Sequence, residues 1–237
     1  DSKITVIPCC ADLNFFSKSS TNQNNVRALK SSLNINDTTF VLNYNGSLGT
    51  WYLMDEMMQF FKELLMVKEA TFLIVTKDEP EIALAAAKKY GVDANKIIVR
   101  SATRAEMPSY IAISNASLFF IRPTFSKSAS SPTKMGELLS MQVPVITNKG
   151  VGDVDGIIAK SNCGVLVDDF DSSYYTIAIK ELLASDKDFE VNRFAHADFQ
   201  NSTEINYEFY FYEGAGLTNV NNWKIDYRAE GFTTQEI

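Results

Sequence analysis

The sequence predicts an α/β protein built on a doubly wound parallel sheet of about six strands, with helices on both faces. Six short apolar segments with strand character alternate with segments of helical periodicity, and the links between them are short. This alternation is typical of parallel sheets, because a crossover, usually a helix, must separate successive parallel strands. Clusters of Gly, Ser and Thr follow the predicted strands. In a Rossmann-like sheet the ligand-binding loops lie at those positions.

The predicted strands are compact, largely apolar runs. They cover residues 39–43, 71–76, 96–99, 117–121, 143–147 and 164–167. The intervening segments are alanine-rich or repeat apolar residues at helical spacing. Helices are predicted around 25–33, over 52–68, within 104–114, over 172–184, and after Asp78, Ser131 and Asp153.

Two of these helices have recognisable start signals. Asp78 is predicted to be an N-cap with Pro80 just inside the helix, and Ser131 a second N-cap with Pro132 at the first helical position. A helix beginning at Ser131 would aim free N–H groups and its dipole at whatever the preceding serine-rich loop encloses. This is a natural site for a phosphate.

Composition and charge exclude several classes of function. The chain has 237 residues, 46% of them apolar, and a net charge of −7. With no basic run, neither nucleic acid nor an anionic membrane surface is expected as the main partner. No apolar run has the length of a spanning helix and no signal-peptide pattern is present, so we expect a cytoplasmic protein.

Cysteine and histidine usage argues against a disulfide framework and a His-based metal cluster. Cys9 and Cys10 are adjacent, Cys163 lies far away, and their spacing does not fit zinc. We expect reduced thiols, with Cys163 buried. A single histidine, His196, leaves little room for a His-based triad and is interpreted as structural.

The chain is expected to be part of a longer protein, because it begins with Asp1 rather than Met and opens directly on a strand-like segment. We predict a connector from a missing N-terminal domain over residues 1–20 and a Rossmann-like domain over 21–185. Residues 186–237 would hold one or two aromatic-rich helices, within 189–212, and a tail without a clear period.

The candidate ligand loops are 46–50, 100–103, 122–131 and 148–153. The first follows a strand and precedes a helix, where backbone N–H groups can hold phosphate. Its candidate residues are Gly46, Ser47, Gly49 and Thr50. It matches neither a Walker loop nor G-x-G-x-x-G, and a tight turn without a ligand is an equal alternative. Ser101 is the candidate from the second loop.

The serine-rich loop before the helix at Ser131 is the stronger phosphate candidate. Hydroxyl groups, a helix start and a cation converge there, from Ser128, Ser130, Ser131, Thr133 and Lys134. An ordinary solvated loop with a helix cap remains an even alternative.

Glu137 lies one helical turn after Lys134, so the two charged side chains point the same way. A carboxylate at this end of the sheet can accept hydrogen bonds from ribose hydroxyls; the alternative is a surface glutamate paired with Lys134 or Lys149. Asp153 and Asp155 are interpreted as caps. Trp51 and Tyr52 could close over a ligand, although core packing is the favoured interpretation.

Four segments resemble blocks of the GT-B glycosyltransferases of family 4, the glycosyl transferases group 1. Residues 7–16, IPCCADLNFF, resemble the I-P-N-G-V-D…F connector between the two domains of that family. Residues 137–146, ELLSMQVPVI, resemble the E-A-M-A-C-G-x-P-V-V block. Residues 148–158 match the G-G-x-x-E loop and residues 163–167 the x-G-x-L-V strand. The resemblance extends over residues 4–212, in the correct order.

The resemblance implies the C-terminal, donor-binding half of a retaining glycosyltransferase of surface polysaccharide or glycan biosynthesis. The donor would be a UDP- or GDP-linked sugar, bound without a metal or other cofactor. A glycan or lipid-linked acceptor would bind the missing domain, which could also hold the protein peripherally at the inner membrane face. This fragment alone would be inactive. Lys134 and Glu137 would be the catalytic residues, with Glu137 on the ribose hydroxyls.

Two family features are absent. The first Glu of the family's E-x7-E motif falls at Ala129, and residues 46–56 contain neither Arg nor Lys, although the family binds diphosphate with such a pair. Lys134, Lys127 or Arg122 could compensate, or the serine-rich loop could donate hydrogen bonds to the phosphate oxygens instead. The alternative is therefore a degenerate domain acting as a nucleotide-binding or protein-interaction module. An epimerase of the same fold ranks below both, because the expected carboxylates and histidines are missing.

Overall fold

The computed structural model describes residues 11–19, 21–49, 51–184, 224–225 and 235–236. Six parallel strands form a sheet in the order β3-β2-β1-β4-β5-β6, which confirms the predicted fold class. The strands lie within two residues of their predicted positions: β1 (Phe40–Asn45), β2 (Ala70–Val75), β3 (Ile97–Arg100), β4 (Ala116–Phe119), β5 (Val145–Asn148) and β6 (Gly164–Val167). Two further short strands pair antiparallel, β7 (Lys224–Ile225) and β8 (Gln235–Glu236).

The strand order reverses between β1 and β4. From β1 the chain moves outward to β2 and β3, and then returns to place β4 on the other side of β1. The loops after β1 and β4 therefore diverge to opposite faces of the sheet. In doubly wound folds the crevice at this switch point is where ligands bind.

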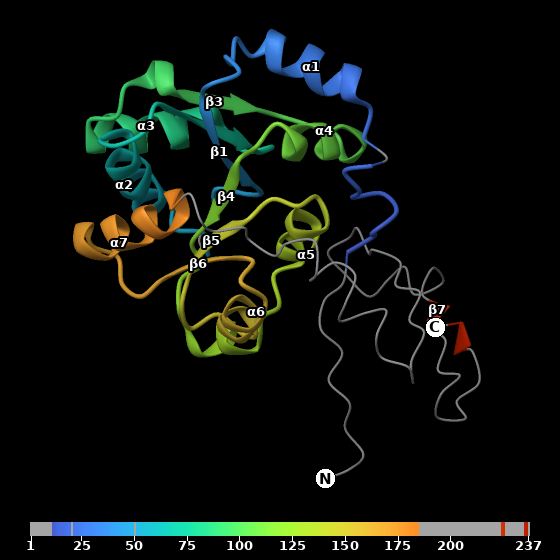
Figure 1. Cartoon of the computed structure of the whole chain (residues 1–237). Coiled ribbons are helices and arrows are strands. Elements are labelled where there is room, and N and C mark those ends of the chain that lie inside the picture. The colour runs from blue at the N-terminus through green and yellow to red at the C-terminus, as the bar shows by residue number, and fades with distance from the viewer. Residues whose placement is uncertain (1–10, 20, 50, 185–223, 226–234, 237) are drawn as a thin grey trace.

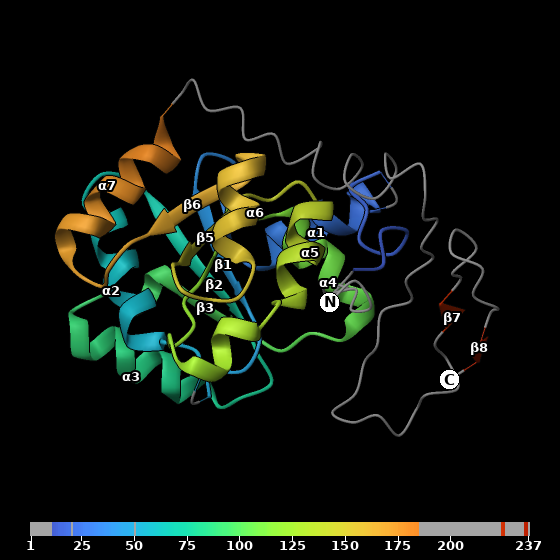
Figure 2. The same cartoon turned by 90° about the horizontal axis from the view of Figure 1, so that it is seen from below.

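Seven α-helices and three short 3-10 helices accompany the sheet in the described residues. The α-helices are α1 (Gln23–Ser32), α2 (Met54–Leu65), α3 (Pro80–Tyr90), α4 (Met107–Ala112), α5 (Thr133–Ser140), α6 (Val154–Ser161) and α7 (Ser172–Leu183). The 3-10 helices are η1 (Ala94–Lys96), η2 (Arg104–Glu106) and η3 (Phe125–Ala129). Helices α2, α3 and α7 lie on one side of the sheet, and α1, α4 and α5 on the other (Figures 1 and 2).

The central strands are covered on both faces, which is why they are apolar throughout. Every residue of β4 and of β5 is buried, and β1 is buried from Val41 onward. On the α2 and α7 side, the rings of Phe60, Phe120 and Tyr175 pack against one another. A smaller cluster that includes Val41 fills the space under α1 and α4.

Two helix starts differ from their predictions. Helix α5 has Pro132 at its N-cap position, and the Ser131 hydroxyl instead donates to the Asp153 carboxylate at 3.0 Å. Helix α3 has Glu79 at its N-cap position, without a side-chain cap hydrogen bond, and the Asp78 carboxylate instead accepts a hydrogen bond from the backbone N–H of Leu48. The helix predicted within 104–114 is α4, which follows η2 and has Pro108 in its first turn.

Several other expectations can be compared with the structure. Cys163 is buried as predicted, and burial raises its thiol pKa to about 11. The prediction that Trp51 packs in the core is wrong, since 46% of this residue is exposed. None of the described helices combines the length and the apolar character needed to cross a bilayer. Predictions for Cys9, Cys10, His196, Thr50 and residues 189–212 lie outside the described residues.

Candidate functional site

A pocket of about 380 Å³ lies at the carboxyl edge of the sheet, at the switch point. Its walls come from the ends and following loops of β1, β2 and β3, from α4, from α5, and from the segment before α1. The lining residues are Phe16, Asn45, Gly46, Ser47, Val75, Thr76, Lys77, Asp78, Ala102, Arg104, Met107, Lys134 and Glu137. The volume falls in the range of small-molecule sites, and charged groups converge on an otherwise largely apolar wall.

Lys134 is the unusual cation of this pocket. It projects from the first turn of α5, and its ammonium nitrogen is buried without a hydrogen-bond partner. Three aromatic rings surround the nitrogen, with centroids 3.7 Å away for Tyr52, 4.6 Å for Tyr44 and 5.7 Å for Phe119. Aromatic faces attract a cation but offer it no lone pair. The nitrogen therefore has donor capacity left for a ligand.

Burial lowers the pKa of Lys134 from 10.5 to about 7, although the nearby Glu137 carboxylate acts in the opposite direction. The cause is desolvation, which disfavours the charged form of a buried amine. Burial also raises the pKa of Tyr44 well above its usual value, so its hydroxyl stays protonated. That hydroxyl donates to the carbonyl of Ser47 at 2.5 Å.

The loop after β1 is held close to this amine. Its backbone is fixed by the Tyr44 bond to Ser47 and by the Asp78 carboxylate, which accepts from the Leu48 N–H. Gly46 has a φ of +137°, and a Cβ atom there would lie 2.9 Å from the Lys134 nitrogen. The backbone conformation therefore favours glycine here, and a larger residue would also have to displace the end of the Lys134 side chain.

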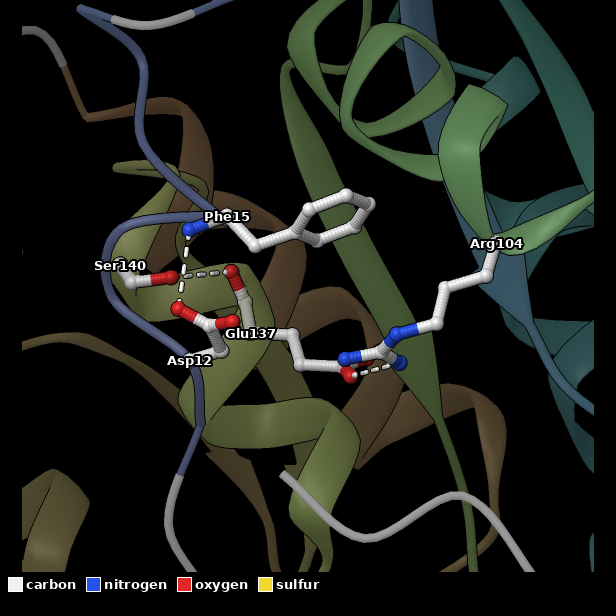
Figure 3. A network of polar contacts seen from close by, with 5 residues as sticks. All are labelled: Asp12, Phe15, Arg104, Glu137 and Ser140. Carbon is white, nitrogen blue, oxygen red and sulfur yellow. Dashed lines mark hydrogen bonds and ion pairs between the residues drawn. The ribbon is translucent and has the colours of Figure 1, made fainter. Parts of the chain in front are cut away.

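Glu137 lies one turn beyond Lys134 on α5 and is paired with a residue from η2. Its Oε1 atom lies 3.5 Å from a guanidinium nitrogen of Arg104, with 15% of the Glu137 side chain and 27% of the Arg104 side chain exposed. Figure 3 shows Arg104 reaching α5 from the opposite wall. The sequence offered Lys134 or Lys149 as the partner of Glu137, but the ion pair is made by Arg104. Lys149 instead contacts Asp168 at 2.8 Å.

Arg104 was not among the residues predicted from the sequence. Its guanidinium carbon lies 5.2 Å from the ring centroids of both Phe15 and Phe16. The Asp12 carboxylate accepts from the backbone N–H of Phe15 at 3.0 Å, which fixes the turn that carries these rings (Figure 3). A local signal for this residue does exist: Thr103 and Glu106 form a capping box, so Arg104 opens a fixed turn at the sheet edge.

Four predicted site residues line the pocket: Gly46, Ser47, Lys134 and Glu137. The others in the described part of the chain do not: Gly49, Ser101, Ser128, Ser130, Ser131 and Thr133. The Ser128 hydroxyl donates to the Phe125 carbonyl within η3, and Ser131 is engaged by Asp153. These two hydroxyls are therefore engaged outside the pocket, within η3 for Ser128 and with the loop before α6 for Ser131.

The pocket is also lined by a buried side-chain amide, that of Asn45, which was not predicted from the sequence. Asn45 ends β1, and its side-chain oxygen is buried without a hydrogen-bond partner. The two other compensating cations considered, Lys127 and Arg122, do not line the pocket. Lys127 lies 4.7 Å from the centroid of the Trp51 ring. Ala129, where the family has its first Glu, is exposed in η3.

Metal-ligating side chains do not gather in the described residues, where no group of three or more His, Cys, Asp or Glu lies within reach of one ion. The charge available to a bound anion in this pocket is that of Lys77, Arg104 and Lys134, facing Asp78 and Glu137. Of these five, Lys134 combines burial of its charged atom with the absence of a hydrogen-bond partner.

Fold and pocket together define a Rossmann-like α/β domain with a pocket at the switch point of the sheet. Residues 39–185 match the model of a family described as glycosyl transferases group 1. The chain belongs to this family, as the resemblance of its sequence blocks implied. No curated protein sequence matches the chain.

Solved structures of similar fold include glycosyltransferases, and this chain spans about half the length of each of those described below. WaaG, a glycosyltransferase involved in lipopolysaccharide biosynthesis, is 19% identical with a TM-score of 0.66, and the match covers 83% of this chain and 52% of WaaG. A glycosyltransferase from Rickettsia africae ESF-5 is 13% identical with a TM-score of 0.61, covering 82% and 51%. Anabaena Alr3699/HepE, in complex with UDP and glucose, is 16% identical with a TM-score of 0.57, covering 74% and 46%. At these identities the likeness shows the fold.

Proposed function

We propose that this chain is the donor-binding half of a retaining glycosyltransferase that transfers sugar from a UDP- or GDP-linked donor to an acceptor in surface polysaccharide or glycan biosynthesis. The observation that carries the proposal is the buried ammonium of Lys134, which faces the switch-point pocket without a hydrogen-bond partner, one turn before Glu137. A cation buried in this way calls for an anionic partner. The UDP bound to HepE is an anion of the required class.

In the proposed complex the diphosphate lies against Lys134 and the loop of Gly46 and Ser47. The Glu137 carboxylate accepts hydrogen bonds from ribose hydroxyls, which are donors of the kind it needs. Because Glu137 is paired with Arg104, its carboxylate is oriented by the protein itself, without help from the ribose. The buried side-chain oxygen of Asn45 can accept a further hydrogen bond, from a hydroxyl group of the nucleotide-sugar.

The proposed reaction breaks the bond between the anomeric carbon and the donor's phosphate oxygen and forms a bond from that carbon to an acceptor hydroxyl oxygen, whose proton passes to the leaving diphosphate. The electron pair stays with the leaving nucleoside diphosphate, whose negative charge grows in the transition state. Lys134 stabilises that charge, and groups fixed in place before the reaction are especially effective in this role. The proposal assigns no metal to the reaction, and it assigns the acceptor, and any contact with a membrane, to the predicted N-terminal domain.

The test is a nucleotide-induced shift of thermal stability, measured on the whole 237-residue chain. UDP or GDP at a hundredfold excess over its dissociation constant is expected to stabilise the fold by about 2.7 kcal/mol. Glu137→Gln keeps the side-chain shape but replaces one acceptor oxygen by a donor group, and should weaken binding by tenfold or more. Glu81→Gln, an exposed carboxylate in the first turn of α3, is the matched control and should bind as wild type does.

A different outcome would favour the second candidate, a degenerate domain that acts in protein interaction. The observation on its side is Ala129, an exposed alanine in η3 where the family has a carboxylate. If neither UDP nor GDP shifts the unfolding temperature of the wild-type chain, donor binding is rejected and this candidate takes its place.

A further inference from the structure

The Lys134 amine is enclosed from several elements, and few of the groups around it are charged. Tyr44 comes from β1, Tyr52 from the turn before α2 and Phe119 from β4. The nearby carboxylate is Glu137, one turn along α5, which is itself engaged by Arg104. Asp78 is engaged by the Leu48 N–H, and Lys77, the remaining charged residue of the wall, is exposed.

These surroundings place the amine between its two protonation states. Desolvation without a hydrogen-bond acceptor disfavours the ammonium form. Three ring faces and the Glu137 carboxylate favour it. Desolvation is the larger effect, and it lowers the pKa of Lys134 to about 7. At neutral pH the Lys134 amine is therefore present in both its neutral and its cationic form.

We propose that the Lys134 amine takes up a proton from solvent as a nucleoside diphosphate enters the pocket, so that anion binding and protonation form one coupled equilibrium. The amine and the proton combine to give the ammonium ion, and no bond to the ligand is made or broken. The inference rests on the proposed function. It follows from geometry, because the diphosphate supplies acceptor oxygens to a buried nitrogen that has no hydrogen-bond partner within the protein.

Linkage fixes the size of the effect. If the bound diphosphate keeps Lys134 fully protonated, binding takes up about half a proton at pH 7 and about nine-tenths at pH 8. Affinity should then fall about fivefold between pH 7 and pH 8 and about tenfold between pH 8 and pH 9. The second ionisation of a phosphate group lies near pH 6, so the ligand itself releases little at pH 8.

The experiment is isothermal titration calorimetry of UDP and GDP into the whole chain at pH 8, in buffers of different ionisation enthalpy. The slope of the observed enthalpy against buffer ionisation enthalpy gives the number of protons taken up. We expect about 0.9 for the wild type. Lys149→Met removes one exposed lysine outside the pocket and should leave this value unchanged.

Two variants at the site make the assignment specific. Lys134→Arg carries a permanent charge, so it should bind the anion with no proton uptake and with affinity that does not change between pH 7 and pH 9. Lys134→Met removes the titrating group and should weaken binding at pH 7 by at least tenfold. Unfolding curves of both variants establish that they are folded.

The outcomes separate this inference from the proposed function. A nucleotide that binds the wild type with less than 0.2 proton taken up overturns the coupling and leaves donor binding intact. Uptake that persists in Lys134→Arg or Lys134→Met assigns the proton to another group and also overturns it. If neither nucleotide binds the wild-type chain, both proposals fall.

Discussion

Besides its proposed role in binding an anion, Lys134 affects the free energy of unfolding of the protein. Its folded-state pKa of about 7 lies below the value near 10.4 of an unfolded lysine. Between these values the unfolded chain binds more protons than the folded one, so the free energy of unfolding rises with pH. The amine is thus most unfavourable for folding below pH 7, where it must be charged in both states.

We therefore expect wild type to gain about 2 kcal/mol of unfolding free energy relative to Lys134→Met between pH 7 and pH 9. Urea unfolding of both proteins at the two pH values measures this gain, and other titrating groups cancel in the difference. Stability profiles that stay parallel between wild type and variant would show that the lysine does not titrate in this range.

Sequence patterns predicted some of the site residues and missed others for a physical reason. The spacing of Lys134 and Glu137 on one helix places them on one face, and local periodicity is enough to predict this. Burial of the Lys134 nitrogen depends on Tyr44 and Tyr52, more than eighty positions earlier in the chain. Arg104 becomes part of the pocket through Phe15 and Glu137, two contacts that are remote in sequence.

At the scale of elements, the loops β4–α5 and β5–α6 interlock. The Ser131 hydroxyl donates to Asp153, and the backbone of Ser130 lies against Gly152. This tertiary contact explains why the predicted Ser131 cap was wrong: a hydroxyl can cap a helix or bond a neighbouring loop, and the local sequence does not decide between them. Strand positions were predicted closely because burial on both faces makes these strands continuously apolar.

Gly152→Ala should open this pair of loops. Gly152 has a φ of +51°, and a Cβ atom would lie 1.5 Å from the Ser130 carbonyl oxygen, so the backbone has to move. We expect a loss of about 2–3 kcal/mol in the free energy of unfolding, measured by urea denaturation. Gly156→Ala is the control, because a Cβ at that position in α6 meets nothing within 4 Å and should stabilise the helix by about 0.5–1 kcal/mol. Equal effects of the two substitutions would contradict the interlocked arrangement.

At the scale of the whole molecule, the segment before α1 packs against the Rossmann-like domain that follows it. Phe16 is 1% exposed and packs in the main hydrophobic cluster, while Ala11 lies against Gly136 of α5. The sequence predicted a connector here, but its blocks could not show that the connector packs onto α5 and lines the pocket. The family match, residues 39–185, begins after this segment.

Phe16→Ala should accordingly cost about 3–5 kcal/mol of unfolding free energy, as expected for removal of a buried aromatic side chain. Leu13→Ala, in the same segment but 40% exposed, should cost less than about 1 kcal/mol. Chemical denaturation of the two variants measures the difference. A small effect of Phe16→Ala would mean that the segment folds independently of the sheet.

The packing of this segment has a consequence for how relatives of the chain are compared. Phe16 forms part of the pocket wall and, with Phe15, holds the arginine that orients Glu137. A protein trimmed to the residues by which the family is recognised would keep Lys134 and Glu137 but lose the support of the opposite wall. The segment that matches the family model is therefore shorter than the unit that lines the pocket, and a comparison confined to residues 39–185 leaves out the pocket wall at Phe16.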